Sequence, residues 1–308
     1  MTRGSLPGLR TLIGTGGRRA LFGAFALLAL SGAAPAATET AAGSGATRIA
    51  VAGGDIAEIV AALGAGGRVV GVDTTTLYPP ELTELPSIGY ARALSAEGVL
   101  SLAPDLLLGA HDAGPATALE QLRAAGLTVA LAPGGEGMEA VPAKIAFVAG
   151  ALGLGPEGQE LTDAYRAEMA EVLEDVGAMP ERPKVLFILT LRDGAPMVGG
   201  AGTSADAMIA LAGGANAAQG FDGYKPMNRE AIMAAAPDVI LMMDRHGEEN
   251  GPDEVLTLPE IAATPAGQAG RLVSMDGMLL LGFGPRTPQA VRELAALLHP
   301  GAPEPTEP

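Results

Sequence analysis

The amino-acid sequence predicts an α/β protein of two lobes, each with a central, mainly parallel sheet, joined by one long connecting helix and with a ligand cleft between the lobes. Three observations lead to this fold class. Short apolar segments alternate with helical segments over residues 48–131, which is typical of βαβ units. Residues 141–176 contain helix formers and no strand candidate, and a second α/β run begins at Lys184. Finally, one sequence pattern recurs in both halves.

The elements of the first lobe follow from changes in this pattern. Buried strands are predicted at 48–52, 69–72, 106–109 and 128–131, with helices at 56–63, 95–102 and 116–125. The turn at 53–55 contains two glycines and Asp55, which we expect to cap the first helix. This turn lacks the G-x-G-x-x-G spacing of a dinucleotide-binding loop, so an ordinary tight turn is the better interpretation.

The whole chain divides into five parts. We predict a signal peptide at 1–37, a first α/β lobe at 48–152, a connecting helix at 156–177, a second α/β lobe at 182–299 and a disordered, proline-rich tail at 300–308. The glycines Gly153 and Gly155 separate the connecting helix from the helical segment before it. A helix over residues 157–176 would be about 30 Å long, which is enough to span two lobes.

The recurring pattern supports the division into two lobes. Glu97 is followed seven residues later by a Pro-Asp pair and an apolar strand, and Glu230 is followed in the same way. A tyrosine, Tyr90 or Tyr224, precedes each acid. An acid, a Pro-Asp pair, a strand and a tyrosine in the same order indicate a duplicated lobe.

The N-terminus has the features of a cleaved export signal. Arg18 and Arg19 precede an apolar run of about 11 residues, and small residues follow as far as Ala37. The run is shorter than the roughly 20 residues of a membrane helix. We therefore expect cleavage near Ala36 or Ala37 and a periplasmic protein, with the general and the twin-arginine export routes both open.

The composition excludes several classes of function. The formal charge is −16, and becomes −20 when residues 1–37 are removed, which argues against nucleic-acid binding. The chain has no cysteine, so disulfides, thiolate metal sites, cysteine nucleophiles and a lipid anchor on cysteine are excluded. No G-x-S-x-G motif is present, and the three histidines lack zinc-site spacing, so an enzyme is not expected. We predict a freely diffusing monomer.

Ligand-binding residues are expected after the strands of both lobes, because ligands of open parallel sheets collect at the carboxyl ends of the strands. The first lobe offers Tyr90, Arg92 and His111, and the second offers Arg192, Tyr224, Arg245 and His246. This set is rich in cations and in metal ligands.

Three motifs carry a resemblance to a known family. They are GYARALSAEG at 89–98, GYKP at 223–226 and LGFGPRTP at 281–288. With these motifs the chain resembles the periplasmic haemin-binding proteins of bacterial haem ABC transporters, over about residues 48–298. These proteins belong to class III of the substrate-binding proteins, which also includes carriers of siderophores and cobalamin.

The resemblance implies that the protein carries ferric haem, Fe(III) protoporphyrin IX, to an inner-membrane ABC permease with its ATPase, for haem transport and iron acquisition. It implies that Tyr90 is the axial ligand of the iron, as phenolate, and that Arg92 donates a hydrogen bond to its oxygen. Ferric iron and a guanidinium both favour the anion of a side chain whose ordinary pKa is about 10.

The remaining candidates have less specific roles. His111 or His246 could approach the iron, and His246 is the better alternative because it would come from the lobe opposite Tyr90. Arg192 and Arg245 are expected to pair with haem propionates, and Tyr224 to contact the haem.

Glu97 and Glu230 have two interpretations. Each lies in the first turn of a predicted helix, where a carboxylate is favoured by the helix dipole. The resemblance implies that both acids dock arginines of the permease.

Two other functions stay open. A protein of the same fold could bind a ferric siderophore or cobalamin, which would leave the Tyr90–Arg92 pair unexplained. An exported α/β metal-dependent hydrolase is the alternative from a different class, because fold alone does not exclude it.

Overall fold

The computed structural model describes residues 45–192, 194–244 and 252–300. They belong to one compact unit, which spans residues 39–308. The predicted signal peptide, Arg245, His246 and residues 301–308 lie outside the described residues. In the described ranges, no helix is both long enough and apolar enough to cross a membrane.

The first sheet has four parallel strands in the order β2-β1-β3-β4. They are β1 (Ile49–Ala52), β2 (Val69–Val72), β3 (Leu106–Gly109) and β4 (Thr128–Leu131). All four residues of β1 and of β3 are buried, as expected for central strands covered on both faces. The strands predicted from the apolar runs are confirmed to within one residue.

Short helices follow the strands of this sheet. They are α1 (Gly54–Ala62), η1 (Gly66–Arg68), α2 (Pro80–Thr83), η2 (Ala91–Ala93), α3 (Ala96–Leu100) and α4 (Ala116–Ala124). The prediction that Asp55 caps the first helix is wrong. The cap is Gly53, whose φ of 130° favours glycine, and Asp55 lies inside the first turn of α1 and is buried. The glycine is required because an added Cβ would lie 2.9 Å from that of Ala110.

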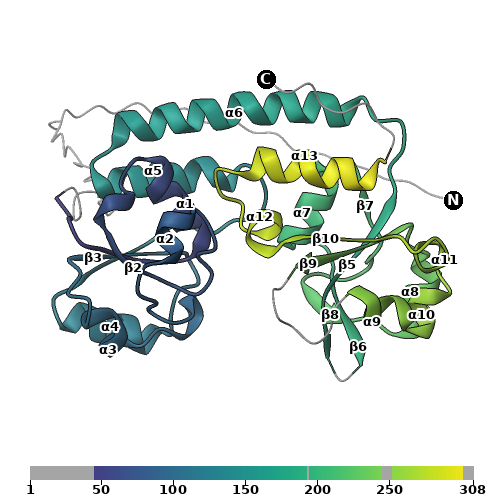
Figure 1. Cartoon of the computed structure of the whole chain (residues 1–308), viewed down its shortest axis with the longest axis horizontal. Coiled ribbons are helices and arrows are strands. Elements are labelled where there is room, and N and C mark those ends of the chain that lie inside the picture. Colours follow the sequence, from purple (N-terminus) through teal and green to yellow (C-terminus); the bar gives the residue numbers. More distant parts are fainter. Residues whose placement is uncertain (1–44, 193, 245–251, 301–308) are drawn as a thin grey trace, which may run out of the picture. The chain divides into compact units, whose positions relative to one another are not determined.

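Two helices connect the sheets in sequence, α5 (Ala140–Leu152) and α6 (Gly155–Gly177). The predicted break between them is present, with Gly153 in the left-handed conformation at the end of α5. The helices pack closely, because a Cβ on Gly158 would lie 2.4 Å from the Cβ of Ala149. Figure 1 shows α6 alongside α5 and α13 (Thr287–Leu298), and it contacts both.

The second sheet has the order β10-β9-β5-β6-β8, with β7 also paired to β5. The strands are β5 (Lys184–Arg192), β6 (Ala195–Gly199), β7 (Ala215–Asn216), β8 (Tyr224–Pro226), β9 (Val239–Asp244) and β10 (Leu272–Asp276). The pairings of β5, β7, β9 and β10 are parallel, whereas β6 and β8 are antiparallel. The antiparallel edge was not predicted. It forms because the connection from β5 to β6 is too short for a parallel crossover.

The helices of the second lobe are α7 (Ser204–Leu211), α8 (Arg229–Ala235), α9 (Pro252–Thr257), α10 (Pro259–Ala262), α11 (Pro265–Gln268), α12 (Gly277–Leu281) and α13. One apolar cluster contains residues of both sheets, among them Ile49 of β1 and Phe187 of β5, together with buried residues of α5, α6, α7 and α13. Each lobe also has a smaller cluster of its own.

The sequence repeat corresponds to a repeated structure. Ala103 and Ala236 immediately precede the two Pro-Asp pairs, and their φ angles are 47° and 46°. Asp105 then accepts hydrogen bonds from the backbone at the start of β1, and Asp238 accepts one from the amide of Lys184 at the start of β5. The Pro-Asp pairs therefore fix the first strand of each lobe.

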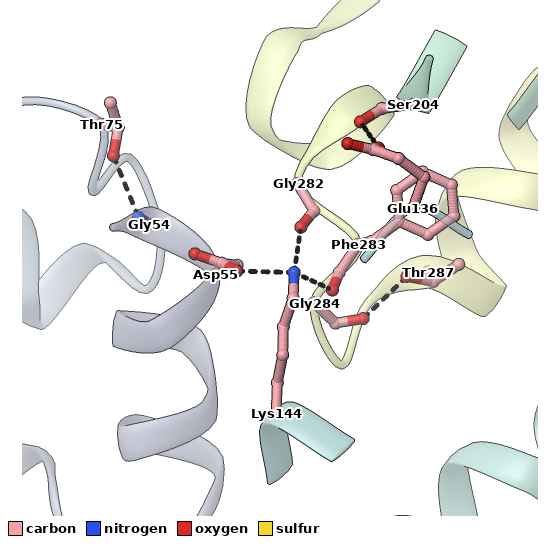
Figure 2. Close-up of polar contacts among 10 residues, drawn as sticks. All are labelled: Gly54, Asp55, Thr75, Glu136, Lys144, Ser204, Gly282, Phe283, Gly284 and Thr287. Atoms are coloured by element: carbon pink, nitrogen blue, oxygen red, sulfur yellow. Dashed lines mark hydrogen bonds and ion pairs between the residues drawn. The ribbon is translucent and has the colours of Figure 1, made fainter. Parts of the chain in front are cut away.

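Buried polar contacts join α1 to the segment between α12 and α13 (Figure 2). Lys144 Nζ donates to Oδ2 of Asp55 at 2.7 Å and to the carbonyl oxygens of Gly282 and Phe283 at 3.2 Å each. Beside this group, Arg286 Nε donates to Oε2 of Glu58 at 3.0 Å. These contacts connect the lobes directly as well as through α6.

Candidate functional site

The backbone around Tyr90 is anchored on both sides of this residue. Gly89 has a φ of 90°, and its carbonyl oxygen accepts a hydrogen bond from the amide of Thr74 at 2.9 Å. The amide of Ala91 donates to Oδ2 of Asp73 at 3.1 Å, and the carbonyl of Ala91 accepts from the amide of Gly114 at 2.8 Å. The backbone is thus fixed, while the tyrosine itself is 43% exposed.

Asp73 is the centre of this anchoring and is only 2% exposed. Its carboxylate accepts hydrogen bonds from the amides of Gly53, Thr75 and Ala91, and so joins the start of α1 to the Tyr90 segment. This residue was not predicted from the sequence. Its position in the sequence could have indicated a structural role, because it is an acid directly after the buried strand β2.

Arg92 lies on η2 beside Tyr90, with its guanidinium carbon 5.9 Å from the centroid of the tyrosine ring. Its Nε donates to Oδ2 of Asp112 at 2.5 Å. Partial burial lowers the pKa of Arg92, but the hydrogen bond and the charge of Asp112 outweigh this and raise the pKa, with a smaller contribution from Tyr90. The structure therefore brings Tyr90 and Arg92 together, and it adds Asp112, which was not predicted from the sequence.

Tyr224 is contributed by the edge strand β8 of the second lobe and is half exposed. Its ring meets Phe187 edge-on, with 6.4 Å between centroids and an interplanar angle of 63°. Burial raises the pKa of the Tyr224 phenol, and the charge of Glu136 raises it further. A hydrogen bond with Thr203 and the positive charge of Arg92 both act to lower the pKa of Tyr224. Arg92 of the first lobe is therefore close enough to Tyr224 to influence its ionisation.

Glu136 extends this region along the loop after β4. Its carboxylate accepts a hydrogen bond from the hydroxyl of Ser204, the first residue of α7 in the second lobe (Figure 2). Glu136 thus contacts the second lobe directly and also raises the pKa of Tyr224. Tyr90 and Asp112 thus lie beside Arg92 in the first lobe, and the charges of Arg92 and Glu136 both influence Tyr224 of the second lobe.

The other predicted ligands are less closely associated with Tyr90. His111 is exposed after β3, and its ring lies against Gly134, where an added Cβ would be 2.8 Å from the ring. Arg192 is exposed at the end of β5. Arg245 and His246 are outside the described residues. Across those described ranges, no three histidine or acidic side chains are grouped to hold a bare metal ion.

Glu97 and Glu230 occupy matching positions in the first turns of α3 and α8, and both are exposed. The helices are capped by other side chains. Ser95 Oγ accepts from the amide of Gly98 at 3.3 Å, and Asn228 Oδ1 accepts from the amide of Ala231 at 2.9 Å. Neither glutamate is the N-cap of its helix, which leaves the carboxylates available for another partner.

Comparison with known proteins gives a consistent result. The family model described as "Periplasmic binding protein" matches residues 49–279. The apo structure of the periplasmic haem-binding protein RhuT from Roseiflexus sp. RS-1 is 43% identical, with a TM-score of 0.80, and the match covers 84% of this chain and all of that one. The periplasmic haem-binding protein BhuT, in complex with two haems, is 45% identical with a TM-score of 0.78, covering 82% of this chain and 97% of that chain.

A curated relative is more distant. An uncharacterised ABC transporter substrate-binding lipoprotein of Bacillus subtilis, YvrC, is 29% identical over 247 residues. The match covers 79% of this chain and 77% of the relative.

Proposed function

Because this chain belongs to the periplasmic binding protein family, we propose that it binds ferric haem between its two lobes and delivers it to an inner-membrane ABC permease with its ATPase. The observation that carries this proposal is the Tyr90–Arg92 pair. An exposed tyrosine is held on a fixed backbone beside a guanidinium, which suits an oxygen ligand for ferric iron. The proposal is supported by haem-binding relatives that are more than 40% identical over more than four fifths of the chain.

Tyr90 would hold the iron as phenolate. An ordinary tyrosine with a pKa near 10 is neutral at physiological pH, so the anion must be stabilised. Ferric iron does so directly, and Arg92 adds a positive charge and a donor. The Nε of Arg92 is occupied by Asp112, so its terminal amino groups would face the phenolate oxygen. One protein ligand would hold the cargo and still allow its release.

The second lobe would complete the binding site. The pKa of Tyr224 is raised, which disfavours its phenolate further, so this side chain would contact the haem as a neutral hydrogen-bond donor and aromatic surface. Phe187 supports its ring. Arg192 and Arg245 would pair with the propionates, and His246 is the alternative iron ligand. Haem is bound here as cargo, and the proposed function requires no chemical reaction.

The location follows from the family and from the sequence. We infer an exported monomer with a signal peptide at 1–37, lobes at 48–152 and 182–299, a connecting helix at 156–177 and a tail at 300–308. YvrC is described as a lipoprotein, whereas this chain has no cysteine that could carry a lipid. A carrier free of the membrane is the resulting proposal. Glu97 and Glu230, one on each lobe, would dock the permease.

The experiment is a titration of the mature protein with haemin, repeated with Tyr90→Phe. We expect a high-spin ferric spectrum with the wild type and its loss with the variant. Tyr78→Phe is a matched control, because Tyr78 is also 43% exposed and also has an arginine, Arg286, over its ring. An unchanged spectrum in Tyr90→Phe would contradict the ligand assignment, and His246→Ala would follow. Tight binding of cobalamin or a ferric siderophore, without haemin binding, would favour the alternative cargo.

A further inference from the structure

Asp112 is the charged side chain that fixes the direction of Arg92. The Nε–Oδ2 distance is 2.5 Å, although the Arg92 side chain is 63% exposed and that of Asp112 is 31% exposed. The bond uses the Nε of the guanidinium. The planar group is therefore oriented, and its terminal nitrogens remain available toward Tyr90, whose ring centroid is 5.9 Å away.

This ion pair joins two loops that are already bonded to each other. The amide of Gly114 donates to the carbonyl of Ala91 at 2.8 Å, and the amide of Leu94 donates to the carbonyl of Gly114 at 2.7 Å. These bonds lie on either side of Arg92 on one loop, and on the other loop both meet at Gly114, two residues after Asp112. Both side chains thus start from fixed backbone positions, which distinguishes the pair from an incidental surface contact.

We propose that Asp112 is a positioning residue, which holds Arg92 toward the oxygen of Tyr90 and thereby slows the release of haem. The inference rests on the proposed function. An exposed arginine has many rotamers, and its hydrogen bond to a phenolate is weakened by the entropy of ordering it. Asp112 supplies that order before the cargo arrives, and it does not itself contact the iron.

The proposal can be separated from a simple effect of charge. A carboxylate near a phenolate repels it, so removing the Asp112 charge alone would strengthen the phenolate ligand and slow haem release. Loss of the fixed Arg92 orientation would instead weaken its hydrogen bond to the phenolate and speed haem release. We expect Asp112→Asn to release haemin about fivefold faster, the upper range for an exposed charged pair. Release would be measured as transfer of haemin to excess apomyoglobin.

A double-mutant cycle provides the decisive test. If Asp112 acts through Arg92, Asp112→Asn no longer speeds release in an Arg92→Ala background, where only the slowing effect of charge removal remains, and Asp112→Glu in the wild-type background keeps release slower than Asp112→Asn does. Glu120→Gln, which neutralises an exposed acid on α4, is the matched control and leaves the rate unchanged. Slower release in Asp112→Asn, an unchanged rate, or the same effect with and without Arg92 would each overturn the proposal.

A measurement without haem keeps this inference distinct from the proposed function. In the apo protein, the Nε–H of Arg92 is expected to give a protected signal in a proton–nitrogen spectrum, identified by its loss in Arg92→Lys. Asp112→Ala, which removes the acceptor, would abolish that protection while the thermal unfolding transition shows a folded protein. If haemin does not bind the wild type, the proposed function fails, but this spectrum still tests the contact. An Nε–H signal unaffected by Asp112→Ala would disprove the positioning role.

Discussion

Lys144 and Asp55 form a buried ion pair, with 2.7 Å between Nζ and Oδ2, and the same ammonium also binds two carbonyl oxygens of the opposite lobe. All three acceptors lie within hydrogen-bonding distance, so each of the three protons of the ammonium has a partner. Such a group costs desolvation energy and is stable only when it is complete.

Removal of Lys144 is therefore expected to destabilise the protein strongly. Lys144→Met leaves Asp55 as an unpaired buried charge and should lower the free energy of unfolding by about 3–5 kcal/mol. Addition of Asp55→Asn removes that charge and should restore part of the loss. Urea unfolding measures both, with Lys184→Met as the control because Lys184 is exposed. Equal stability of Lys144→Met and the control would contradict the importance of this contact.

The ionisation of Tyr224 provides a test of the electrostatic interaction between the lobes. The pKa of this phenol should rise further in Arg92→Ala, because a positive charge that favours the phenolate is removed. In Glu136→Gln it should fall, because a repelling negative charge is removed. Ultraviolet titration, with Tyr224→Phe to identify the signal, measures both shifts. Shifts of the same sign in the two variants would be inconsistent with the observed arrangement.

The same pKa shift affects stability at high pH. A tyrosine whose pKa is raised in the folded state binds its proton more tightly there than in the unfolded chain. This tighter proton binding contributes fully to the free energy of unfolding below the unfolded pKa of about 10. The contribution is lost as the pH rises toward the pKa of the folded state. We expect Tyr224→Phe to show a smaller loss of stability than the wild type above about pH 10, in urea unfolding followed across this range.

Asp73 is expected to be necessary for the position of Tyr90. Asp73→Ala removes the acceptor of three backbone amides and should cost about 2–4 kcal/mol, since each buried donor left unpaired is unfavourable. Hydrogen exchange should accelerate at the amides of Gly53 and Ala91. Haemin affinity, measured where the variant is fully folded, should also fall. Unchanged affinity would show that the Tyr90 segment is held by its other bonds.

The contact between α5 and α6 depends on Gly158. The methyl group of Gly158→Ala would lie only 2.4 Å from the Cβ of Ala149. This overpacking should destabilise the protein by about 1–3 kcal/mol. Gly177→Ala in the same helix meets no atom within 4 Å and is the matched control, expected to be neutral or slightly stabilising. Thermal unfolding compares the two. Equal transition temperatures would show that the helices separate without cost.

Docking and binding should be separable by mutation. Glu97→Ala and Glu230→Ala are expected to bind haemin like the wild type, because neither acid belongs to the site around Tyr90. Each variant should deliver haem to the reconstituted transporter about tenfold less well, as expected when one partner of an interface ion pair is removed. Glu81→Ala, an exposed acid on α2, is the control. Normal delivery by Glu97→Ala together with Glu230→Ala would rule out docking through these acids.

The sequence is most informative where a local pattern decides the structure. Apolar runs determined the four strands of the first sheet, and Gly153 marked the break before α6. Tyr90 and Arg92 lie side by side because both belong to one short motif, and their roles as iron ligand and hydrogen-bond donor stay predictions. The positions of β6 and β8 could not be predicted in this way, because strand direction depends on which edge of the sheet is free.

Residues that act across long sequence separations were missed. Asp112 is 20 residues from Arg92, and Lys144 is 89 residues from Asp55, so no local pattern links them. Asp55 illustrates the resulting error. An aspartate after two glycines is a typical helix cap, but here it is the second residue of the helix, within the first turn, and is neutralised by a lysine from another helix.

The apolar cluster shared by both sheets has a consequence for the history of this chain. If the two halves descend from one duplicated unit, a separate half with the present core would expose part of the shared cluster, because Ile49 and Phe187 belong to the same cluster. Pairing of a half-length ancestor with a second copy of itself would have covered that surface. Fusion through α6 would then have made a permanent, asymmetric dimer, in which one half was free to acquire Tyr90 and Arg92.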